Sequence, residues 1–227
     1  MKYLLTILLF SSISFSKEIK VMVMDTGIDP STIEIMPYLA NTNTFDDLID
    51  NYGHGTHIAG IIASSGCVNL KIISCKFANK NTGNIPKMLA CYERAIKEKV
   101  DIINLSAGGT SFNDKESEVL KRVDAAGIKT IVAAGNDAKN LGSPCWGYFP
   151  ACLRLPNMTV VGALGKDGKI WYGPYDKGSN WGIPDMKWEY GQDILSNYPG
   201  NRYATMTGTS QATANFTKHL VQSLCHQ

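Results

Sequence analysis

The sequence predicts an α/β domain built as a three-layer sandwich, with a mainly parallel, doubly wound sheet between two layers of helices. Five short apolar runs recur along the chain, at 19–24, 72–77, 100–105, 128–134 and 158–163. Segments with helical patterning lie between them, at 58–63, 86–99 and 113–126. Strands that are buried on both faces and separated by helices are typical of parallel sheets covered by helices on both sides.

Local signals place the ends of the helices. The first helix begins near Gly55 and continues through 58–63. Pro86 suits the first turn of the second helix, and Gly127 suits the end of the third. Ser210 follows a glycine turn and enters the last helix. Because ligands of open parallel sheets bind at the carboxyl ends of the strands, motifs at those ends are candidates for chemistry.

Length and composition favour one compact domain. The chain has 227 residues, of which 44% are hydrophobic, and this suffices for a substantial core. The formal net charge of +2 gives no support to nucleic-acid binding. No internal repeat, linker or low-complexity segment interrupts the alternation of strands and helices.

The first sixteen residues have the pattern of a secretory signal peptide. Lys2 supplies a positive charge, 3–10 is apolar, and Ser14 and Ser16 are small residues two apart. The alternative is an uncleaved membrane anchor, but the apolar run is short for a span. We therefore expect a signal peptide at 1–16 and a domain at 17–227. The protein would be secreted or periplasmic, without stable membrane association after cleavage.

Six cysteines in an exported chain favour disulfides, although three bridges allow 15 connectivities. Cys145 and Cys152 are close in sequence and form the expected local pair. Cys75 lies within an apolar strand, so it is the first candidate for a buried free thiol.

Three segments carry candidate chemistry. Asp25 stands where the first strand ends, His54 and His57 lie on a helix that glycines precede, and Ser210 begins the last helix. Taken singly, they can be a turn residue, a helix cap and an N-cap. Taken together, they supply the nucleophile, base and orienting carboxylate that acyl transfer needs. A serine at a helix N-terminus also offers a backbone N–H to a developing oxyanion.

The chain resembles the subtilases, a family of serine proteases. The resemblance rests on Asp25-Thr26-Gly27, His54-Gly55-Thr56-His57-Ile58-Ala59-Gly60 and Gly208-Thr209-Ser210, which occur in the order that subtilisin uses. It implies a catalytic triad of Asp25, His54 and Ser210, with His54 rather than His57 as the base. Residues 133–136 resemble the family's oxyanion segment, which makes Asn136 the oxyanion donor.

The same resemblance implies where the substrate binds. Residues 104–109 resemble the segment that pairs with the substrate as an added strand. The expected substrate-binding residues are Ser106, Ala107, Gly108, Ala133, Ala134, Gly135 and Gly147. Gly147 is the candidate floor of the first specificity pocket. Because these residues are small, we expect a large apolar side chain before the scissile bond, with some tolerance for basic residues beside Asp137.

The chain also departs from the family's pattern. It has no recognisable pro-region, and Gln211 and Asn215 stand where the family favours methionine and proline. Residues 64–69 replace a common calcium-binding loop and contain no carboxylate, so we expect no metal and no cofactor. We interpret the cluster of Asp46, Asp47 and Asp50 as a solvated loop. In the implied fold, a Cys67–Cys225 bridge would tie the C-terminus to the core.

The sequence therefore predicts a monomeric serine endopeptidase that hydrolyses polypeptides through an acyl-enzyme. One alternative is a catalytically inactive fold of the same family that serves as a binding module. Another is an esterase or peptide ligase with the same acyl-enzyme chemistry.

Overall fold

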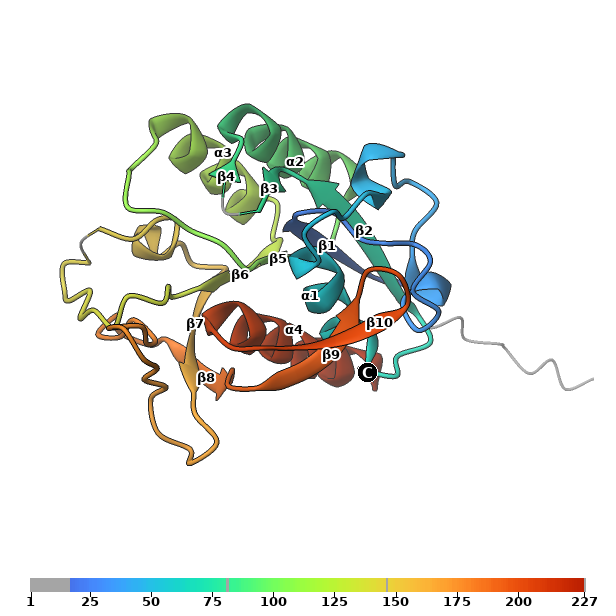
Figure 1. Cartoon of the computed structure of the whole chain (residues 1–227). Coiled ribbons are helices and arrows are strands. Elements are labelled where there is room, and N and C mark those ends of the chain that lie inside the picture. Colours follow the sequence, from blue (N-terminus) through green and yellow to red (C-terminus); the bar gives the residue numbers. More distant parts are fainter. Residues whose placement is uncertain (1–16, 81, 146, 227) are drawn as a thin grey trace, which may run out of the picture.

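A computed structural model describes residues 17–80, 82–145 and 147–226, built around one six-stranded sheet (Figure 1). All neighbouring strands are parallel, in the order β2-β1-β5-β6-β7-β8. The strands are β1 (Ile19–Asp25), β2 (Leu70–Lys76), β5 (Ile102–Leu105), β6 (Lys129–Ala133), β7 (Met158–Leu164) and β8 (Lys187–Tyr190). The five predicted strands are confirmed, and β8 is an addition.

Helices cover both faces of the sheet, which confirms the three-layer prediction (Figure 1). The helices α2 (Ile85–Glu98) and α3 (Asp114–Ala125) lie on one face, and α1 (His54–Ala63) and α4 (Thr209–Cys225) lie on the other. Successive side chains of β1 point to opposite layers. Met22 and Met24 pack in the core beneath α2 and α3, whereas Val21 and Val23 pack beneath α1 and α4.

Side-chain caps explain where two of the helices begin. Asn84 precedes α2 and accepts the Lys87 N–H at 2.9 Å, with Pro86 in the first turn. Asn113 precedes α3 and accepts the Glu116 N–H at 2.9 Å. An Asn side chain in this position satisfies a backbone donor that the helix itself leaves unpaired. The predicted starts of both helices are therefore correct to within one residue.

Smaller elements complete the fold. An antiparallel hairpin of β9 (Ile194–Tyr198) and β10 (Arg202–Met206) packs on α1, and a short one joins β3 (Ala78–Asn79) to β4 (Thr82–Gly83). Three 3-10 helices are η1 (Met36–Tyr38), η2 (Asp46–Leu48) and η3 (Ala151–Leu153). A Cβ at Gly60 of α1 would lie 2.4 Å from Asn197 Oδ1, so β9 approaches the helix backbone directly.

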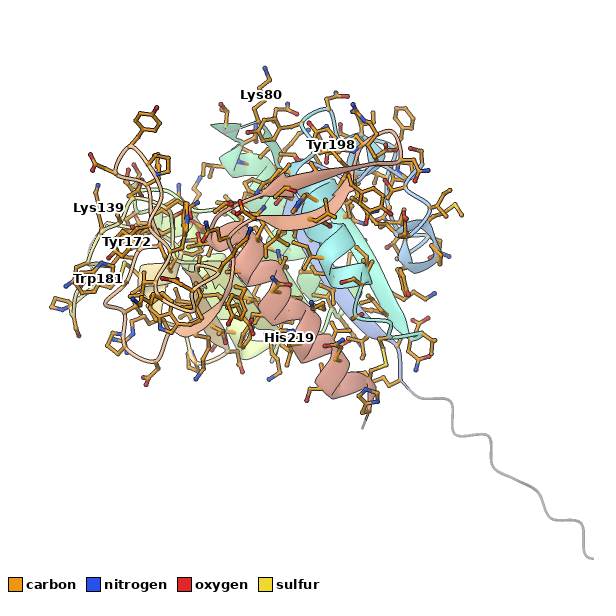
Figure 2. The ribbon with its side chains drawn as sticks, turned by 60° about the horizontal axis from the view of Figure 1, so that its bottom comes forward. Lys80, Lys139, Tyr172, Trp181, Tyr198 and His219 are labelled. Atoms are coloured by element: carbon orange, nitrogen blue, oxygen red, sulfur yellow. A yellow bond between two sulfur atoms is a disulfide. The ribbon has the colours of Figure 1, made fainter. Side chains whose placement is uncertain are left out.

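Long-range contacts hold the surface segments against this frame. The Tyr198 hydroxyl donates to the Tyr52 carbonyl at 3.0 Å, just before α1. The Trp181 N–H donates to the Lys139 carbonyl at 2.9 Å, and His219 on α4 pairs with Glu189 on β8 at 2.9 Å. Figure 2 labels Tyr198, Trp181, Lys139 and His219 and shows that these contacts lie in separate parts of the surface.

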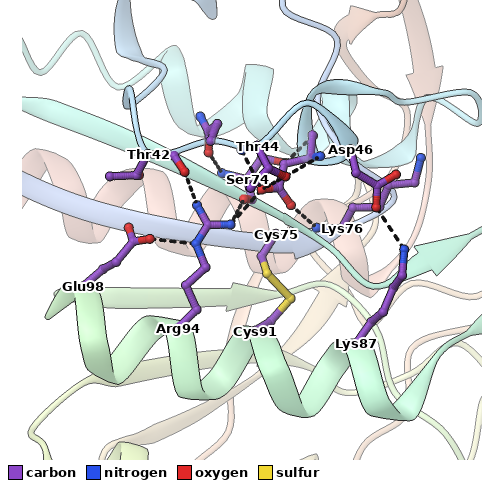
Figure 3. Close-up of polar contacts among 12 residues, drawn as sticks. Thr42, Thr44, Asp46, Ser74, Cys75, Lys76, Lys87, Cys91, Arg94 and Glu98 are labelled. Atoms are coloured by element: carbon purple, nitrogen blue, oxygen red, sulfur yellow. Dashed lines mark hydrogen bonds and ion pairs between the residues drawn. A yellow bond between two sulfur atoms is a disulfide. The ribbon is translucent and has the colours of Figure 1, made fainter.

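Three disulfides connect the cysteines. The expected Cys145–Cys152 and Cys67–Cys225 pairs are confirmed. The expectation of a free thiol at Cys75 is wrong, because Cys75 is bonded to Cys91. Cys75 points from β2 toward the layer that contains α2, and Cys91 is buried on the facing side of that helix, with the Cα atoms 5.8 Å apart (Figure 3).

The acidic cluster is solvated only in part, because the Asp46 side chain is exposed whereas Asp47 is buried. The Asp47 side chain is only 8% exposed, and it accepts hydrogen bonds from Arg94 of α2 at 2.7 Å and from the Lys76 N–H at 3.0 Å. Burial alone would raise the pKa of Asp47, but these hydrogen bonds and those from Thr44 lower it. Asp50 is buried as well. Within the described ranges, no group of three or more His, Cys, Asp or Glu residues is arranged to hold a metal ion.

The outer edge of β2 is closed by the same region. The Ser74 N–H donates to Asn43 Oδ1 at 2.7 Å, and the Ala40 N–H donates to the Ile72 carbonyl at 2.9 Å. Arg94 also donates to the Ser74 carbonyl at 3.2 Å. The backbone groups that an edge strand normally leaves open are therefore paired along this edge.

The predicted signal peptide at 1–16 lies outside the described residues. Among the residues that are described, no helix combines the length and the apolarity needed to cross a membrane.

Candidate active site

The first functional pair comes from the end of β1 and the start of α1. His54 Nδ1 lies 2.8 Å from Asp25 Oδ1 and 2.9 Å from Oδ2. The Asp25 side chain is 2% exposed and also accepts the Thr26 N–H at 2.8 Å, whereas His54 keeps 22% of its side chain exposed. A carboxylate that accepts from Nδ1 fixes the tautomer in which Nε2 can take a proton.

One buried carboxylate, Asp50, joins the loop after β1 to the first turn of α1. Its Oδ1 accepts from the Thr26 hydroxyl at 2.9 Å and from the Gly53 N–H at 2.7 Å. Its Oδ2 accepts from the N–H and the hydroxyl of Thr56, at 2.8 and 2.7 Å. Thr26 Oγ1 in turn accepts the Gly55 N–H at 2.9 Å. This network fixes the end of the strand against the start of the helix.

The pKa values of the two histidines are shifted in opposite directions. Burial alone would lower the pKa of His54, but the charge and hydrogen bond of Asp25 raise it above its usual value. His57 is fully buried, and its Nε2 donates to the carbonyls of Ile194 and Ala204 at 3.0 and 3.1 Å. Burial dominates there and lowers the pKa of His57. The structure thus brings His54 to Asp25, whereas His57 joins α1 to the β9–β10 hairpin.

Ser210 lies in the first turn of α4 and is tied to the end of β5 by two reciprocal hydrogen bonds. Ser210 Oγ donates to the Ser106 carbonyl at 2.9 Å, and Ser106 Oγ donates to the Ser210 carbonyl at 2.9 Å. Asn104 Nδ2 donates to Ser106 Oγ at 3.0 Å, and its Oδ1 accepts from the Thr217 hydroxyl at 2.8 Å. The Ser210 hydroxyl therefore bonds to the backbone carbonyl of Ser106, just after β5, and not to His54.

Asn136 follows β6 and is held by the residue before Ser210. Its Oδ1 accepts from the N–H of Thr209 at 2.8 Å and from the Thr209 hydroxyl at 3.0 Å. Thr209 Oγ1 also accepts the Gly135 N–H at 3.2 Å. A Cβ at Gly208 would lie 3.2 Å from the Asn136 amide, so a side chain there would crowd that amide. These contacts fix Oδ1 and orient Nδ2 as the donor that the amide presents to the cleft.

These side chains open onto one cleft of about 840 Å³. Its lining includes Asp25, His54, Ser210 and Asn136, together with the predicted substrate-binding residues Ser106, Ala107 and Gly108. These side chains meet there because the carboxyl ends of β1, β5 and β6 lie at one edge of a parallel sheet.

The other predicted substrate-binding residues lie elsewhere. Ala133, Ala134 and Gly135 are buried and do not line the cleft. Gly147 is exposed, a Cβ added to it would contact nothing within 4 Å, and it does not line the cleft either. Its neighbour Tyr148 lines the cleft in its place. The structure therefore places the large side chain of Tyr148 in the cleft wall, next to the position where a pocket floor at Gly147 was expected.

Comparison with known proteins identifies the family of the chain. The model of the subtilase family, Peptidase_S8, matches residues 16–224. The chain belongs to the subtilase family. Its members are serine proteases, and serine proteases are hydrolases.

Two curated relatives are bacterial proteases. This subtilase is 31% identical over 212 residues to an intracellular serine protease of Paenibacillus polymyxa, covering 86% of the chain and 63% of the relative. It is 29% identical over 214 residues to the major intracellular serine protease of Bacillus subtilis (strain 168), covering 86% and 65%. The chain therefore spans less than two thirds of the length of these relatives.

A solved structure supports the fold. A cold adapted subtilisin-like serine proteinase superposes on this subtilase with a TM-score of 0.76 at 22% identity. The match covers 93% of this chain and 77% of the other.

The sequence did not reveal three residues that shape the site of this subtilase. Asp50 and Thr209 position the side chains around them. Thr209 lies within the third motif and Asp50 within the acidic cluster, but neither residue was assigned a role in the site from the sequence. Tyr148 had a weaker signal, its place between Cys145 and Cys152.

Proposed function

We propose that this subtilase is a secreted serine endopeptidase that hydrolyses polypeptides through an acyl-enzyme. One observation carries the proposal. The Asp25–His54 pair, with 2.8 Å between its closest atoms, opens onto the same cleft as Ser210 and Asn136. All four side chains come from one chain, so the site needs no second subunit, and we propose that the protein acts as a monomer.

In this mechanism Ser210 Oγ attacks the scissile carbonyl while His54 Nε2 takes its proton, and His54 later returns a proton to the leaving amine. Asp25 accepts from Nδ1 and stabilises the imidazolium that forms. The attack requires Ser210 Oγ to leave the Ser106 carbonyl, to which it donates at 2.9 Å, and to turn toward His54. Catalytic hydrogen bonds of this kind often form only when substrate is bound.

The oxyanion would be held by two donors. Asn136 Nδ2 is oriented by the bonds that Thr209 makes to Oδ1, at 2.8 and 3.0 Å. The Ser210 N–H belongs to the first turn of a helix of 17 residues, where backbone donors have no partner within the helix. The positive end of the helix dipole adds a favourable field for the negative oxygen. Preorganised donors of this kind stabilise charge that develops only in the transition state.

The cellular compartment is the less direct part of the proposal. Three disulfides favour an oxidising environment, because cytosolic proteins rarely keep structural disulfides. The predicted signal peptide at 1–16 agrees with export. The two bacterial relatives described above are named intracellular proteases, so we propose that this chain differs from them in location. Expression with and without 1–16, followed by fractionation and thiol titration, tests this. A reduced cytoplasmic protein in both cases would contradict export.

Active-site labelling tests the proposed chemistry. We expect a fluorophosphonate to label the purified protein on Ser210 and the protein to cleave a mixed peptide library. Ser210→Ala should lose both activities, and Asn136→Ala should keep labelling but cleave slowly. Folded protein that neither labels nor cleaves would refute the proposal and favour a binding module. Turnover of esters without any cleavage of peptides would favour an esterase.

A further inference from the structure

The ring of Tyr148 occupies the space between the ends of β5 and β6. A Cβ at Gly108, after β5, would lie 2.5 Å from Tyr148 Cε1 and 2.7 Å from Cζ. A Cβ at Gly135, after β6, would lie 2.6 Å from Cζ and 2.7 Å from Cε2. Both edges of one ring therefore approach glycine backbone, one on each side. Any side chain at Gly108 or Gly135 would collide with the ring, so the two glycines make room for Tyr148.

The backbone around Tyr148 fixes the ring in this place. The N–H and the carbonyl of Phe149 pair with Gly109 at 2.7 and 2.9 Å, which joins the segment to the end of β5. The Phe149 ring packs edge-on against Phe112, with 5.2 Å between the centroids. The Cys145–Cys152 disulfide closes the loop around the tyrosine. Tyr148 is thus part of the cleft wall and not a side chain on a free loop.

The hydroxyl of Tyr148 is neutral at working pH. Burial, together with the nearby charge of Asp137, raises the pKa of Tyr148 to about 12. The ring therefore presents an uncharged phenol to the cleft, which offers no counter-charge for a lysine or arginine side chain.

A bound peptide would place one side chain against this ring. In the proposed mechanism the scissile carbonyl lies between Ser210 Oγ and Asn136 Nδ2. Ser210 is hydrogen-bonded to Ser106, just after β5, and Asn136 follows β6, so this position is close to the ends of both strands. On this placement we infer that the side chain on the acyl side of that carbonyl faces the gap between Gly108 and Gly135. In this chain Tyr148 already fills the gap, and Ala133 and Ala134 behind it are fully buried.

We propose that Tyr148 is the specificity-determining residue of this subtilase and restricts the residue before the scissile bond to glycine, alanine or serine. This inference rests on the proposed function. It replaces the expectation of a large apolar residue at this position, which assumed that only small side chains line the gap. A small residue needs little of the space that the ring occupies, whereas a phenylalanine or leucine would have to displace the ring and the segment paired with Gly109.

The test uses peptides that differ at one position. Internally quenched peptides of constant flanking sequence carry Gly, Ala, Ser, Leu, Phe or Lys before a single cleavable bond, and kcat/KM is measured for each. For the wild-type protein we expect Ala to exceed Phe and Leu by at least about tenfold, the lower end of the discrimination that a pocket gives. Tyr148→Gly should reverse this order by gaining activity on Phe and Leu, and Tyr148→Phe should keep it.

Two controls separate the possible failures. Tyr175→Gly makes the same substitution at a tyrosine that is 93% exposed, and it should leave both the rates and their order unchanged. Fluorophosphonate labelling of each variant reports the active-site serine independently of specificity. If the wild-type protein labels and prefers Phe or Leu, the inference is wrong while the proposed function stands. If the folded wild-type protein neither labels nor cleaves, the proposed function fails and the inference fails with it.

If Tyr148→Gly does not fold, the wild-type protein and Tyr148→Phe still test the inference. The order of wild-type rates refutes it if large residues are preferred. The Tyr148→Phe variant retains the ring and removes only the hydroxyl, so a reversal of preference in that variant would also overturn the steric argument.

Discussion

Breaking the Cys67–Cys225 bridge should destabilise the protein more than breaking either of the other disulfides. The bridge joins the segment after α1 to the last residue of α4, and it spans a sequence separation of 158 residues. A cross-link restricts the unfolded chain more strongly when it closes a longer loop. The double variant Cys67→Ala/Cys225→Ala removes the bridge without placing a hydroxyl at Cys67, which is 2% exposed.

The expected loss follows from the loop length. A separation of 158 residues corresponds to about 5 kcal/mol in the chain-entropy relation, at room temperature. The Cys145–Cys152 bridge has a separation of 7 residues, and the same relation gives about 2.4 kcal/mol. For a domain of this size, about 5 kcal/mol lowers the midpoint of thermal unfolding by about 10–20 °C.

Thermal and urea unfolding of Ser210→Ala protein provide the assay, because that background prevents self-digestion. Cys145→Ala/Cys152→Ala is the matched control, and we expect it to unfold at a higher temperature than Cys67→Ala/Cys225→Ala. EGTA should leave the midpoint unchanged, because residues 64–69 contain no carboxylate. If loss of the 158-residue loop costs no more than loss of the 7-residue loop, the entropic argument fails. A large effect of EGTA would contradict the expectation of no structural calcium.

Three further predictions concern single groups. Asn136→Ala should lose about 2.7–4 kcal/mol of transition-state stabilisation, measured as a fall in kcat, and wild-type turnover would exclude Asn136 as the oxyanion donor. Because Asp25 raises the pKa of His54 and the base must be neutral, kcat/KM should fall as pH decreases through a pKa above the usual value of about 6.5; an optimum in mild acid would contradict this role. Arg94→Leu leaves the buried Asp47 carboxylate without its cation and should lower the free energy of unfolding by about 3–5 kcal/mol, measured with urea. Lys87→Leu, at the exposed pair with Asp46, is the control, and an equally small loss of less than about 1 kcal/mol in both variants would refute the prediction.

The sequence predicted the centre of the fold because hydrophobic patterning dominates there. Its five apolar runs became β1, β2, β5, β6 and β7, since a strand that is covered on both faces must be apolar throughout. The strand β8 was missed because it lies at the edge of the sheet. Lys187 and Glu189 alternate there with Trp188 and Tyr190, so the segment lacks the continuous apolar run that identified the other strands.

The sequence predicted those site residues that belong to motifs at strand and helix ends. It did not predict those whose positions depend on tertiary packing. Asp25, His54 and Ser210 stand at such ends, the resemblance to the subtilases implied their roles and that of Asn136, and the structure brings all four to one cleft. The place of Tyr148 depends on the pairing between Phe149 and Gly109, forty residues apart, and no local pattern encodes that contact. The wrong expectation of a free thiol at Cys75 has a similar origin. Only the packing of α2 against β2 shows that Cys91 lies opposite Cys75.

The closed edge of β2 has a consequence for behaviour at high concentration. An open strand edge is a template on which another chain can add a strand, and growth from such edges leads to aggregation. Here Asn43, Asp47 and Arg94 occupy the backbone groups of β2 that would receive a new strand. At the opposite edge, β8 is only four residues long and carries Lys187 and Glu189. The sheet therefore ends on both sides in groups that discourage another molecule from extending it, and we expect the folded protein not to add strands from its neighbours when it is concentrated.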